Sequence, residues 1–280
     1  MSPRNADPRT VDGFGDEWER FDQSKLDSEE HLALFKKYFK VFPWSRLPSQ
    51  PVGFDMGCGS GRWAQLVAPK VGRLHCIDPS SAIEVAKRNL RLHANCEFHA
   101  AGVADAVLPE NSMDFGYSLG VLHHVPETAE GIKACVRYLK PGAPFLLYLY
   151  YALDNRSAFY RALWKTSDVL RRVISKLPHG ARYVASQVIA GLVYWPVARL
   201  ARAAETCGVS TARAAAMPLG FYRHLSFYTM RTDALDRFGT ALEQRYTKAQ
   251  ILRLMELAGL TDVVFSDESP YWCAVGYRGR

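Results

Sequence analysis

Hydrophobic residues between positions 50 and 150 follow a repeating pattern. Short, continuous apolar runs alternate with longer segments in which apolar residues recur every three or four positions. The first pattern is typical of buried parallel strands, and the second of helices that cover them. The predicted strands are 52–56, 73–78, 95–99, 113–119 and 143–149, and the predicted helices are 61–69, 80–92 and 127–139, with a short helix after the third strand. This order predicts an α/β fold in which the loops after the strand carboxyl ends meet at one sheet edge.

The two ends of the chain extend this pattern. Residues 1–27 are polar with scattered aromatics, and a helix is predicted over about 28–41. The final segment predicts a helix over 247–258 and strands over 261–266 and 271–277. Together these elements predict a seven-stranded, mostly parallel sheet with helices on both faces.

Residues 152–244 form a predicted helical insertion between the fifth and sixth strands. Its first part combines an apolar stripe with basic residues, and a later part, from Tyr183 to Ala198, has sixteen residues without a charge. A membrane span needs about 20 apolar residues, so this run is too short to predict a transmembrane helix. Two interpretations stay open: a helical cap whose apolar faces pack on each other, and an interfacial element that contacts a membrane.

The net charge of +7 is concentrated in this insertion. Residues 152–246 contain 14 Lys and Arg against 6 Asp and Glu, whereas the rest of the chain contains 21 against 22. Such a basic region can face nucleic acid, a phosphorylated small molecule or an anionic membrane, and charge alone does not separate them.

Composition predicts a soluble core without cross-links. The chain has 280 residues and 48% hydrophobic composition, enough for a large buried core. Its cysteines form no C-x-x-C pair and no His/Cys cluster with zinc spacing, so we expect buried apolar residues in a reducing cytoplasm. They are Cys58, Cys76, Cys96, Cys135, Cys207 and Cys273. The N-terminus has no apolar signal core, which also favours the cytoplasm.

A glycine-rich turn follows the first predicted strand. Residues 54–61 are Phe-Asp-Met-Gly-Cys-Gly-Ser-Gly, and alternating glycines at such a turn expose backbone N–H groups to a ligand. The next strand ends in Asp78, where a carboxylate can accept from both hydroxyls of a ribose. A dinucleotide fingerprint would need a third glycine where Arg62 stands, which disfavours NAD.

The pattern D-x-G-x-G-x-G, followed by a strand-ending acid, resembles that of the class I S-adenosylmethionine-dependent methyltransferases. Two further blocks are similar to this family: SMDFGYSLGVLHHVP at 112–126, which matches its fourth strand and loop, and VRYLKPGA at 136–143, which matches its fifth-strand region. The resemblance covers roughly residues 50–150 and, more weakly, 245–277. It implies a Rossmann-like fold that binds S-adenosylmethionine and releases S-adenosylhomocysteine.

The resemblance also implies a division of the chain. Residues 1–45 would be an N-terminal helical segment or lid, and residues 46–151 with 245–280 would be the cofactor domain. Residues 152–244 would be a helical cap that forms a substrate insertion.

Specific cofactor contacts follow from the matched positions. Asp55 would orient the glycine loop or reach the amino group through water, and Asp78 would bind the ribose. Val103 and Ala104 match the positions that flank adenine, although the usual acid is displaced to Asp105. The full predicted cofactor set is Asp55, Gly57, Cys58, Gly59, Gly61, Asp78, Pro79, Val103, Ala104, Leu119, Gly120 and Trp18. Of these, Leu119 and Gly120 would border the methionine portion, and Trp18 would close over it.

Methyl transfer from a sulfonium is an in-line displacement, so few catalytic side chains are needed. A hydroxyl acceptor must lose its proton, which a general base with a pKa near neutrality assists. His123 and His124 follow the fourth strand, and in relatives that methylate small-molecule hydroxyls a histidine in this loop can be the base. We favour His124; the alternative for either residue is packing against the cofactor or capping the next helix. Tyr151 is a further proton-transfer candidate, and Tyr150 is a candidate for the substrate wall.

Aromatic and polar residues alternate over 221–228 in the insertion. Arg223 there could pair with a phosphate or carboxylate, or the segment could be an amphipathic edge with solvated polar residues. The predicted substrate residues are Tyr150, Tyr222, Arg223, His224 and Tyr228. No metal site is predicted, because no acidic cluster stands beside the histidine pair.

The predicted function is methyl transfer to an oxygen, less readily a nitrogen, of a small-molecule or lipid-linked acceptor. RNA or protein methylation is an alternative, but the chain lacks a separate RNA-binding module and has Leu-Gly-Val-Leu at 119–122 instead of a polar Asn-Pro-Pro-Tyr type motif. A non-catalytic cofactor-binding scaffold is a third possibility. We expect a cytoplasmic protein. Contact of the basic insertion with the inner membrane face and the oligomeric state stay open.

Overall fold

The structure, a computed structural model, describes residues 4–280. Its internal contacts divide the chain into two compact units. The sheet unit contains the chain up to Gln23, Leu32–Asp154 and Leu242–Arg280, and the helical unit contains Ser24–His31 and Asn155–Ala241. The N-terminal residues therefore group with the sheet, whereas the sequence pattern treats residues 1–45 as a segment of their own.

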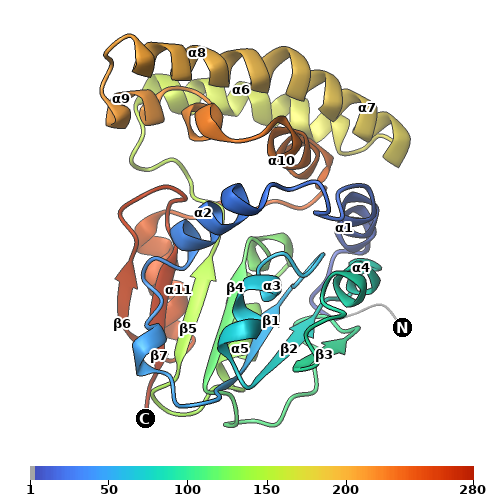
Figure 1. Cartoon of the computed structure of the whole chain (residues 1–280), viewed down its shortest axis with the longest axis vertical. Coiled ribbons are helices and arrows are strands. Elements are labelled where there is room, and N and C mark those ends of the chain that lie inside the picture. Colours follow the sequence, from blue (N-terminus) through green and yellow to red (C-terminus); the bar gives the residue numbers. More distant parts are fainter. Residues whose placement is uncertain (1–3) are drawn as a thin grey trace. The chain divides into compact units, whose positions relative to one another are not determined.

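The sheet unit is built on seven strands in the order β3-β2-β1-β4-β5-β7-β6 (Figure 1). The strands are β1 (Val52–Met56), β2 (Arg73–Ile77), β3 (Cys96–His99), β4 (Phe115–Leu119), β5 (Pro144–Tyr148), β6 (Leu260–Phe265) and β7 (Ala274–Arg278). Only β7 runs antiparallel to its neighbours. This topology confirms the predicted Rossmann-like, mostly parallel sheet, with the helical insertion between the fifth and sixth strands.

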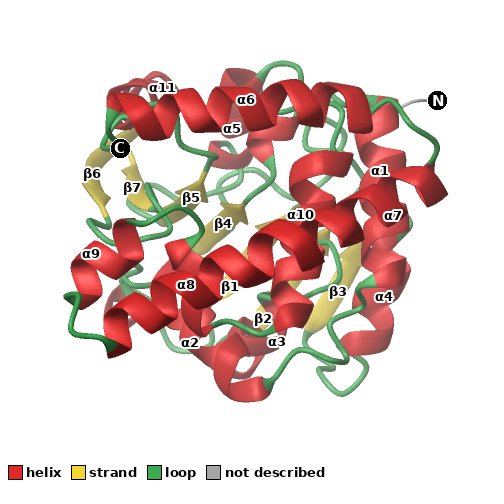
Figure 2. Cartoon of the chain, turned by 90° about the horizontal axis from the view of Figure 1, so that it is seen from above, coloured by secondary structure: helices red, strands yellow, loops and turns green. Residues whose placement is uncertain are grey.

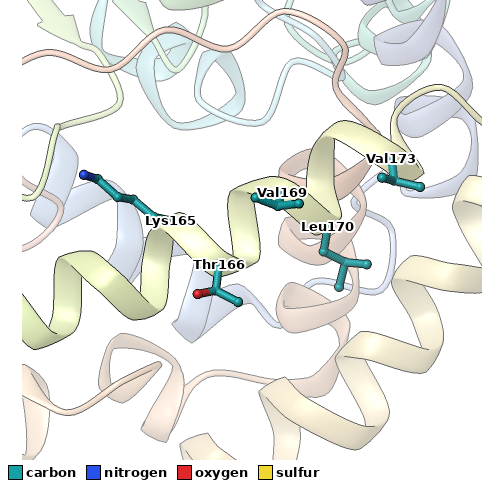
Figure 3. Close-up of a pocket in the computed structure, with 5 residues that line it drawn as sticks. All are labelled: Lys165, Thr166, Val169, Leu170 and Val173. Atoms are coloured by element: carbon teal, nitrogen blue, oxygen red, sulfur yellow. The ribbon is translucent and has the colours of Figure 1, made fainter.

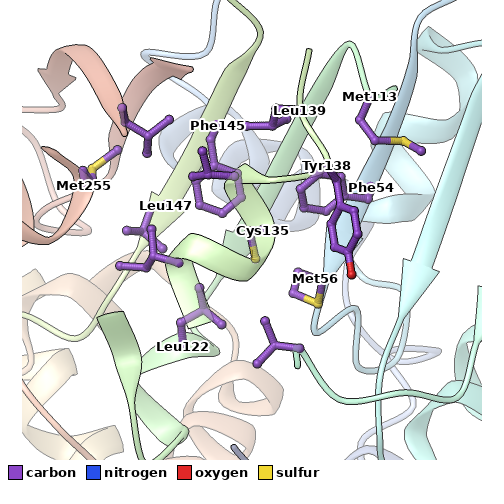
Figure 4. Packing of buried hydrophobic residues seen from close by; sticks show 14 of the residues in the cluster. Phe54, Met56, Met113, Leu122, Cys135, Tyr138, Leu139, Phe145, Leu147 and Met255 are labelled. Atoms are coloured by element: carbon purple, nitrogen blue, oxygen red, sulfur yellow. The ribbon is translucent and has the colours of Figure 1, made fainter. Parts of the chain in front are cut away.

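Helices cover both faces of this sheet. The helices of the unit are α1 (Pro8–Arg20), α2 (Ser28–Tyr38), α3 (Ala64–Val67), α4 (Ala82–Asn89), α5 (Thr128–Val136) and α11 (Lys248–Leu257), with short 3-10 turns at Trp44–Arg46, Ala68–Lys70 and Leu122–His124. One core cluster joins the strands to α5 and α11, and Figure 4 shows Phe54, Tyr138 and Phe145 packed within it. A second cluster joins the other face to α2, α3 and α4. Burial of both faces explains why the strands are continuous apolar runs rather than alternating ones.

The N-terminal helix α1 is more regular than the sequence suggested. Its side-chain cap is Asp7, which accepts from the Thr10 backbone N–H at 2.8 Å. Gly15 lies against α4, because a Cβ at this position would approach the Ser81 hydroxyl oxygen to 2.6 Å. The aromatic residues of this segment do not show the helical period clearly. The helix packs closely against α4 because Gly15 has no side chain. The predicted short helix after β3, in contrast, is a turn.

The helical unit consists of helices and connecting loops (Figure 2). They are α6 (Ala158–Ile174), α7 (His179–Ile189), a π-helical segment (Ala190–Tyr194), α8 (Trp195–Thr206), α9 (Thr211–Ala216), a 3-10 turn (Gly220–His224) and α10 (Phe227–Gly239). The uncharged run joins its flanks into one helix, His179–Thr206, that is long and apolar enough to cross a membrane by length and composition alone. Several of its residues pack in the core of the unit, among them Ala190, Tyr194 and Ala198.

Candidate active site

The glycine-rich turn lies where β1 ends, beside the end of β2. The N–H groups of Gly57 and Cys58 both donate to the carbonyl oxygen of Ile77, at 2.8 and 3.0 Å. Gly57, Gly59 and Gly61 all have positive φ, at 82°, 52° and 77°. The turn is therefore anchored to its neighbouring strand in a conformation that favours glycine, as the sequence predicts.

Asp78 connects this turn to the next strand. One carboxylate oxygen accepts from the Gly59 N–H at 2.9 Å, and the other accepts from the N–H and hydroxyl of Ser80 at 2.9 and 2.6 Å. Burial raises the pKa of Asp78, and the hydrogen bonds from Ser80 and Gly59 oppose this rise. A carboxylate oxygen has more than one lone pair, so Asp78 can hold the turn and still accept from a ribose hydroxyl.

Asp55 has an oxygen that the protein leaves unpaired. The residue is 1% exposed, and its Oδ2 has no hydrogen-bond partner among the described residues. Burial is the main cause of the raised pKa of Asp55; the Tyr117 hydroxyl opposes this rise, and the negative charge of Asp78 adds to it. A buried acceptor without a partner costs free energy unless a ligand or water satisfies it. This orphaned oxygen fits the predicted role toward the cofactor's amino group.

Gly120 at the end of β4 faces open space. Its φ is 78°, and no atom lies within 4 Å of the position that a Cβ would take. Leu119 beside it is buried in the sheet core. The space next to Gly120 fits the predicted position of the methionine portion.

Trp18 lies on the glycine loop. Its indole nitrogen is 2.9 Å from the position of a Cβ on Gly59. A side chain at Gly59 would therefore meet Trp18 before it reached a bound ligand. The N-terminal segment is also held at the loop after β3, where Arg4 pairs with Asp105 at 2.8 Å and donates to the Ala104 carbonyl at 3.0 Å. The carboxylate of Asp105, the displaced acid, is thus paired with Arg4.

The remaining predicted cofactor residues line the same strand ends. Cys58 is buried, and burial raises the pKa of its thiol to about 11, so it contributes a neutral side chain. Val103 belongs to the apolar core, and Pro79 follows Asp78 directly.

His124 is positioned by the segment that returns from the helical unit. Its Nδ1 lies 2.6 Å from the carbonyl oxygen of Leu242, which can only accept, so Nδ1 carries the proton. In the neutral ring the lone pair is then on Nε2. The residue is 4% exposed, and Phe14 of α1 packs edge-on against it with ring centroids 5.0 Å apart. A fixed tautomer with a lone pair on Nε2 is the state that a general base requires.

His123 lies in a different environment. The residue is 0% exposed, and neither ring nitrogen has a hydrogen-bond partner among the described residues. Its ring packs on Tyr150 at 3.9 Å and on His124 at 3.8 Å, so the two histidine rings lie against each other. Burial lowers the pKa of His123 well below its ordinary value of 6.5, and the neighbouring His124 and Arg245 add to this. This geometry favours a packing role for His123.

The two tyrosines after β5 have separate surroundings. The Arg245 guanidinium lies 5.1 Å from the ring of Tyr150, on the histidine side. Tyr151 instead forms a backbone bridge with Tyr246 and packs 5.5 Å from the ring of Tyr271. Tyr150 is therefore next to the histidine pair, whereas Tyr151 contributes to the neighbouring core.

The predicted substrate residues of the insertion form an internal cluster of the helical unit. Arg223 pairs with Glu205 at 2.8 Å and also donates to the Gly220 carbonyl at 3.0 Å. His224 contacts the same carboxylate at 2.7 Å. Tyr222 packs 5.2 Å from Tyr194, and Tyr228 lies in the first turn of α10. The Arg223 guanidinium is already paired with the Glu205 carboxylate, and its binding of an anionic substrate stays a prediction.

A second histidine group lies on β2 and β3. His75 Nδ1 is 3.1 Å from His99 Nε2 and 3.3 Å from Glu97, whose carboxylate also pairs with Arg73 at 3.1 Å. The ligand atoms of the three residues lie within 4.8 Å of one another. Sequence spacing did not reveal this group, because strand pairing brings His75 opposite Glu97. The ion pair between Arg73 and Glu97 and the contacts of His75 explain why these side chains lie together.

These features define an α/β protein with a nucleotide-type cofactor site at the carboxyl edge of its sheet. Residues 54–147 match a family model described as a methyltransferase domain. A "Probable S-adenosylmethionine-dependent methyltransferase" of Mycolicibacterium smegmatis is 30% identical over 133 residues, covering 46% of this chain and 49% of that protein. A ubiquinone biosynthesis O-methyltransferase of Paracidovorax citrulli is 27% identical over 138 residues, covering 48% and 56%.

The chain thus spans about half the length of these curated relatives. A solved S-adenosylmethionine-dependent methyltransferase of Thermotoga maritima has the same fold, with a TM-score of 0.51 at 12% identity over 95% of this chain and 100% of that one. Residues 54–147 thus match a methyltransferase domain, and the similar proteins and the sheet topology support a class I S-adenosylmethionine-dependent methyltransferase domain with S-adenosylmethionine as its cofactor.

Proposed function

We propose that the protein transfers a methyl group from S-adenosylmethionine to an oxygen of a small-molecule or lipid-linked acceptor. The observation that carries this proposal is the hydrogen bond from His124 Nδ1 to the Leu242 carbonyl, at 2.6 Å. It leaves the lone pair of the ring on Nε2, a buried nitrogen in the loop after β4. An alcohol or phenol acceptor needs such a base, and a neutral amine needs it less. The O-methyltransferase among the similar proteins is consistent with an oxygen acceptor.

The roles of the residues follow from their geometry. When bound, S-adenosylmethionine supplies an electrophilic methyl group on a sulfonium. Asp78 accepts from the ribose hydroxyls, and Asp55 Oδ2 accepts from the amino end directly or through water. His124 Nε2 would take the proton of the acceptor's hydroxyl group, and the sulfonium of the bound cofactor would supply the methyl group. Tyr150, stacked on His123, forms the wall on the histidine side.

The acceptor class rests on the chemistry of the insertion. Its exposed apolar and basic side chains favour an acceptor that is itself anchored in lipid or carries an anionic group. We propose the cytoplasm, at the inner membrane face, as the location. RNA or protein methylation and a non-catalytic scaffold are the competing functions that the experiment below separates.

The test is to incubate the purified protein with methyl-labelled S-adenosylmethionine and host lysate, then measure label in lipid, aqueous small-molecule, protein and nucleic-acid fractions. Label in the lipid or aqueous fraction supports the proposal, and alkali-stable, ether-type methyl products identify oxygen as the acceptor. Label in protein or nucleic acid overturns the acceptor class. Absence of label with intact cofactor binding, measured by calorimetry, favours a scaffold.

A further inference from the structure

Helix α6 has its polar side inward. Asp168 and Arg171 are 7% and 6% exposed, and the Asp168 carboxylate accepts from Arg171 Nε at 2.7 Å. Arg171 also donates to the Thr240 carbonyl at 3.1 Å, and Arg237 lies 3.7 Å from Asp168. Burial alone would raise the pKa of Asp168, but these arginines hold it below its ordinary value. An ion-pair network, together with Ile174 in the apolar core of the unit, therefore attaches α6 to the rest of its unit.

The opposite face of α6 is apolar and exposed. Positions 163, 166, 169, 170, 173 and 177 are linked by steps of three and four, which places them in one stripe along the helix and the turn after it, with Thr166 as its polar member. The exposed side chains are Leu163 (48%), Val169 (64%), Leu170 (48%), Val173 (60%) and Leu177 (39%). Figure 3 shows Val169, Leu170 and Val173 on this face, where an open groove of about 530 Å³ is lined by residues of α6 alone.

Basic residues run along one edge of this stripe. They are Arg161, Lys165, Arg172 and Lys176, all exposed. The only acidic residue of α6 is Asp168, which is buried in the ion-pair network. We propose that this outer face of α6, with its apolar stripe and basic edge, docks onto the surface of an anionic lipid bilayer.

The positive charge along the edge of this face favours an anionic bilayer over a second copy of the chain as its partner. An interfacial helix inserts its apolar side chains among the acyl chains while its basic residues contact anionic headgroups. Arg172 pairs with Asp168 at 2.9 Å, but a second copy of the chain would bring Arg161, Lys165 and Lys176 to the same patch with no exposed carboxylate on α6 to pair them. The neighbouring helix His179–Thr206 exposes Val184, Val188, Leu192 and Trp195 as well, but has no comparable basic edge over this stretch.

The outer face of α6 would be the surface that places the protein at the membrane, a location that rests on the proposed function. Its test needs neither cofactor nor acceptor, so its failure leaves methyl transfer standing. The full chain is sedimented with vesicles of phosphatidylcholine alone and of phosphatidylcholine with phosphatidylglycerol. We expect binding to the anionic vesicles that weakens with added salt. Replacing both Lys165 and Lys176 with Ala lowers the partition coefficient by about 30-fold, because each basic residue near the surface contributes about fivefold.

The apolar stripe is tested by the double substitution Val169→Asp and Val173→Asp, which we expect to abolish binding. The matched control is Val107→Asp, because Val107 is 88% exposed on the sheet unit. Circular dichroism checks that all variants fold. Failure to bind either vesicle type, or equal binding by the wild type and both α6 variants, overturns the proposal. So does a wild-type dimer, detected by light scattering, that the Val169/Val173 variant converts to a monomer.

Discussion

Trp18 rests directly on Gly59, with its indole nitrogen 2.9 Å from the position that a Cβ on the glycine would take. Helix α1 thus places a side chain against the same turn whose Gly59 N–H donates to the Asp78 carboxylate. The glycine loop has protein on two sides, so a substitution within it disturbs the fold of the site before it reaches a ligand.

Gly59→Val is therefore expected to abolish S-adenosylmethionine binding. Its φ of 52° is strained for a β-branched residue, and the new side chain collides with Trp18. Isothermal titration calorimetry measures the loss. Gly59→Ala in a Trp18→Ala background removes the collision and keeps the strain of about 1–2 kcal/mol. Wild-type affinity in Gly59→Val would show that the turn does not contact the cofactor.

His124→Ala is expected to keep cofactor affinity and to lower turnover by about 10²- to 10⁴-fold, the usual contribution of a general base. The control is His124→Gln, which can still donate to the Leu242 carbonyl but cannot accept a proton for catalysis. Calorimetry gives affinity, and labelled methyl transfer gives the rate. If the Gln variant retains full turnover, His124 only positions its neighbours, and another group removes the proton.

Local pattern was enough to predict the sheet, since strand and helix positions agree with the structure within a few residues in most elements. The apolar runs of β1, β4 and β5 have a single stable arrangement once both faces are covered. The glycine turn and the position of Asp78 at the end of the next strand were also predictable, because both follow from residues that lie close together in the sequence.

Contacts between distant residues were not predictable. The tautomer of His124 depends on Leu242, more than a hundred residues away, and the pairing of Arg223 depends on Glu205. A lone basic residue in a sequence gives no sign of the carboxylate that pairs with it. Likewise, the apolar stripe of α6 was visible, but its outward direction follows from the buried position of Asp168.

Asp78→Ala is expected to weaken cofactor binding by roughly 10- to 100-fold, since a hydrogen bond to a charged group contributes about 1.5–3 kcal/mol. The loss combines the ribose contact with the bond to the Gly59 N–H. Ser80→Ala is the control, because it removes a hydroxyl from the same carboxylate and leaves the acceptor in place. Equal affinity of Asp78→Ala and wild type in calorimetry would remove Asp78 from the cofactor site.

His123 should make the folded protein less stable in mild acid. Its folded pKa lies well below 6.5, so below pH 6.5 the unfolded chain binds a proton that the folded protein does not. Stability then falls as pH drops, by up to about 1.4 kcal/mol per pH unit for this group. Asp55 and Asp78, whose pKa values are raised, act in the opposite direction. The measurement is therefore the difference between wild type and His123→Phe in urea unfolding between pH 5 and about 7; parallel curves would contradict the prediction.

Asp168→Ala should destabilise the helical unit by about 3 kcal/mol, because it leaves buried cationic side chains without their carboxylate. The side chains of Asp168 and Arg171 are only 10% and 7% exposed. In the sheet unit, Glu84 pairs with Lys87 at side-chain exposures of 60% and 46%, so Glu84→Ala should cost less than about 0.5 kcal/mol. Urea unfolding followed by circular dichroism compares the two. If Asp168→Ala costs no more than Glu84→Ala, the ion-pair network does not hold α6, and the outward direction of its apolar stripe loses its physical cause.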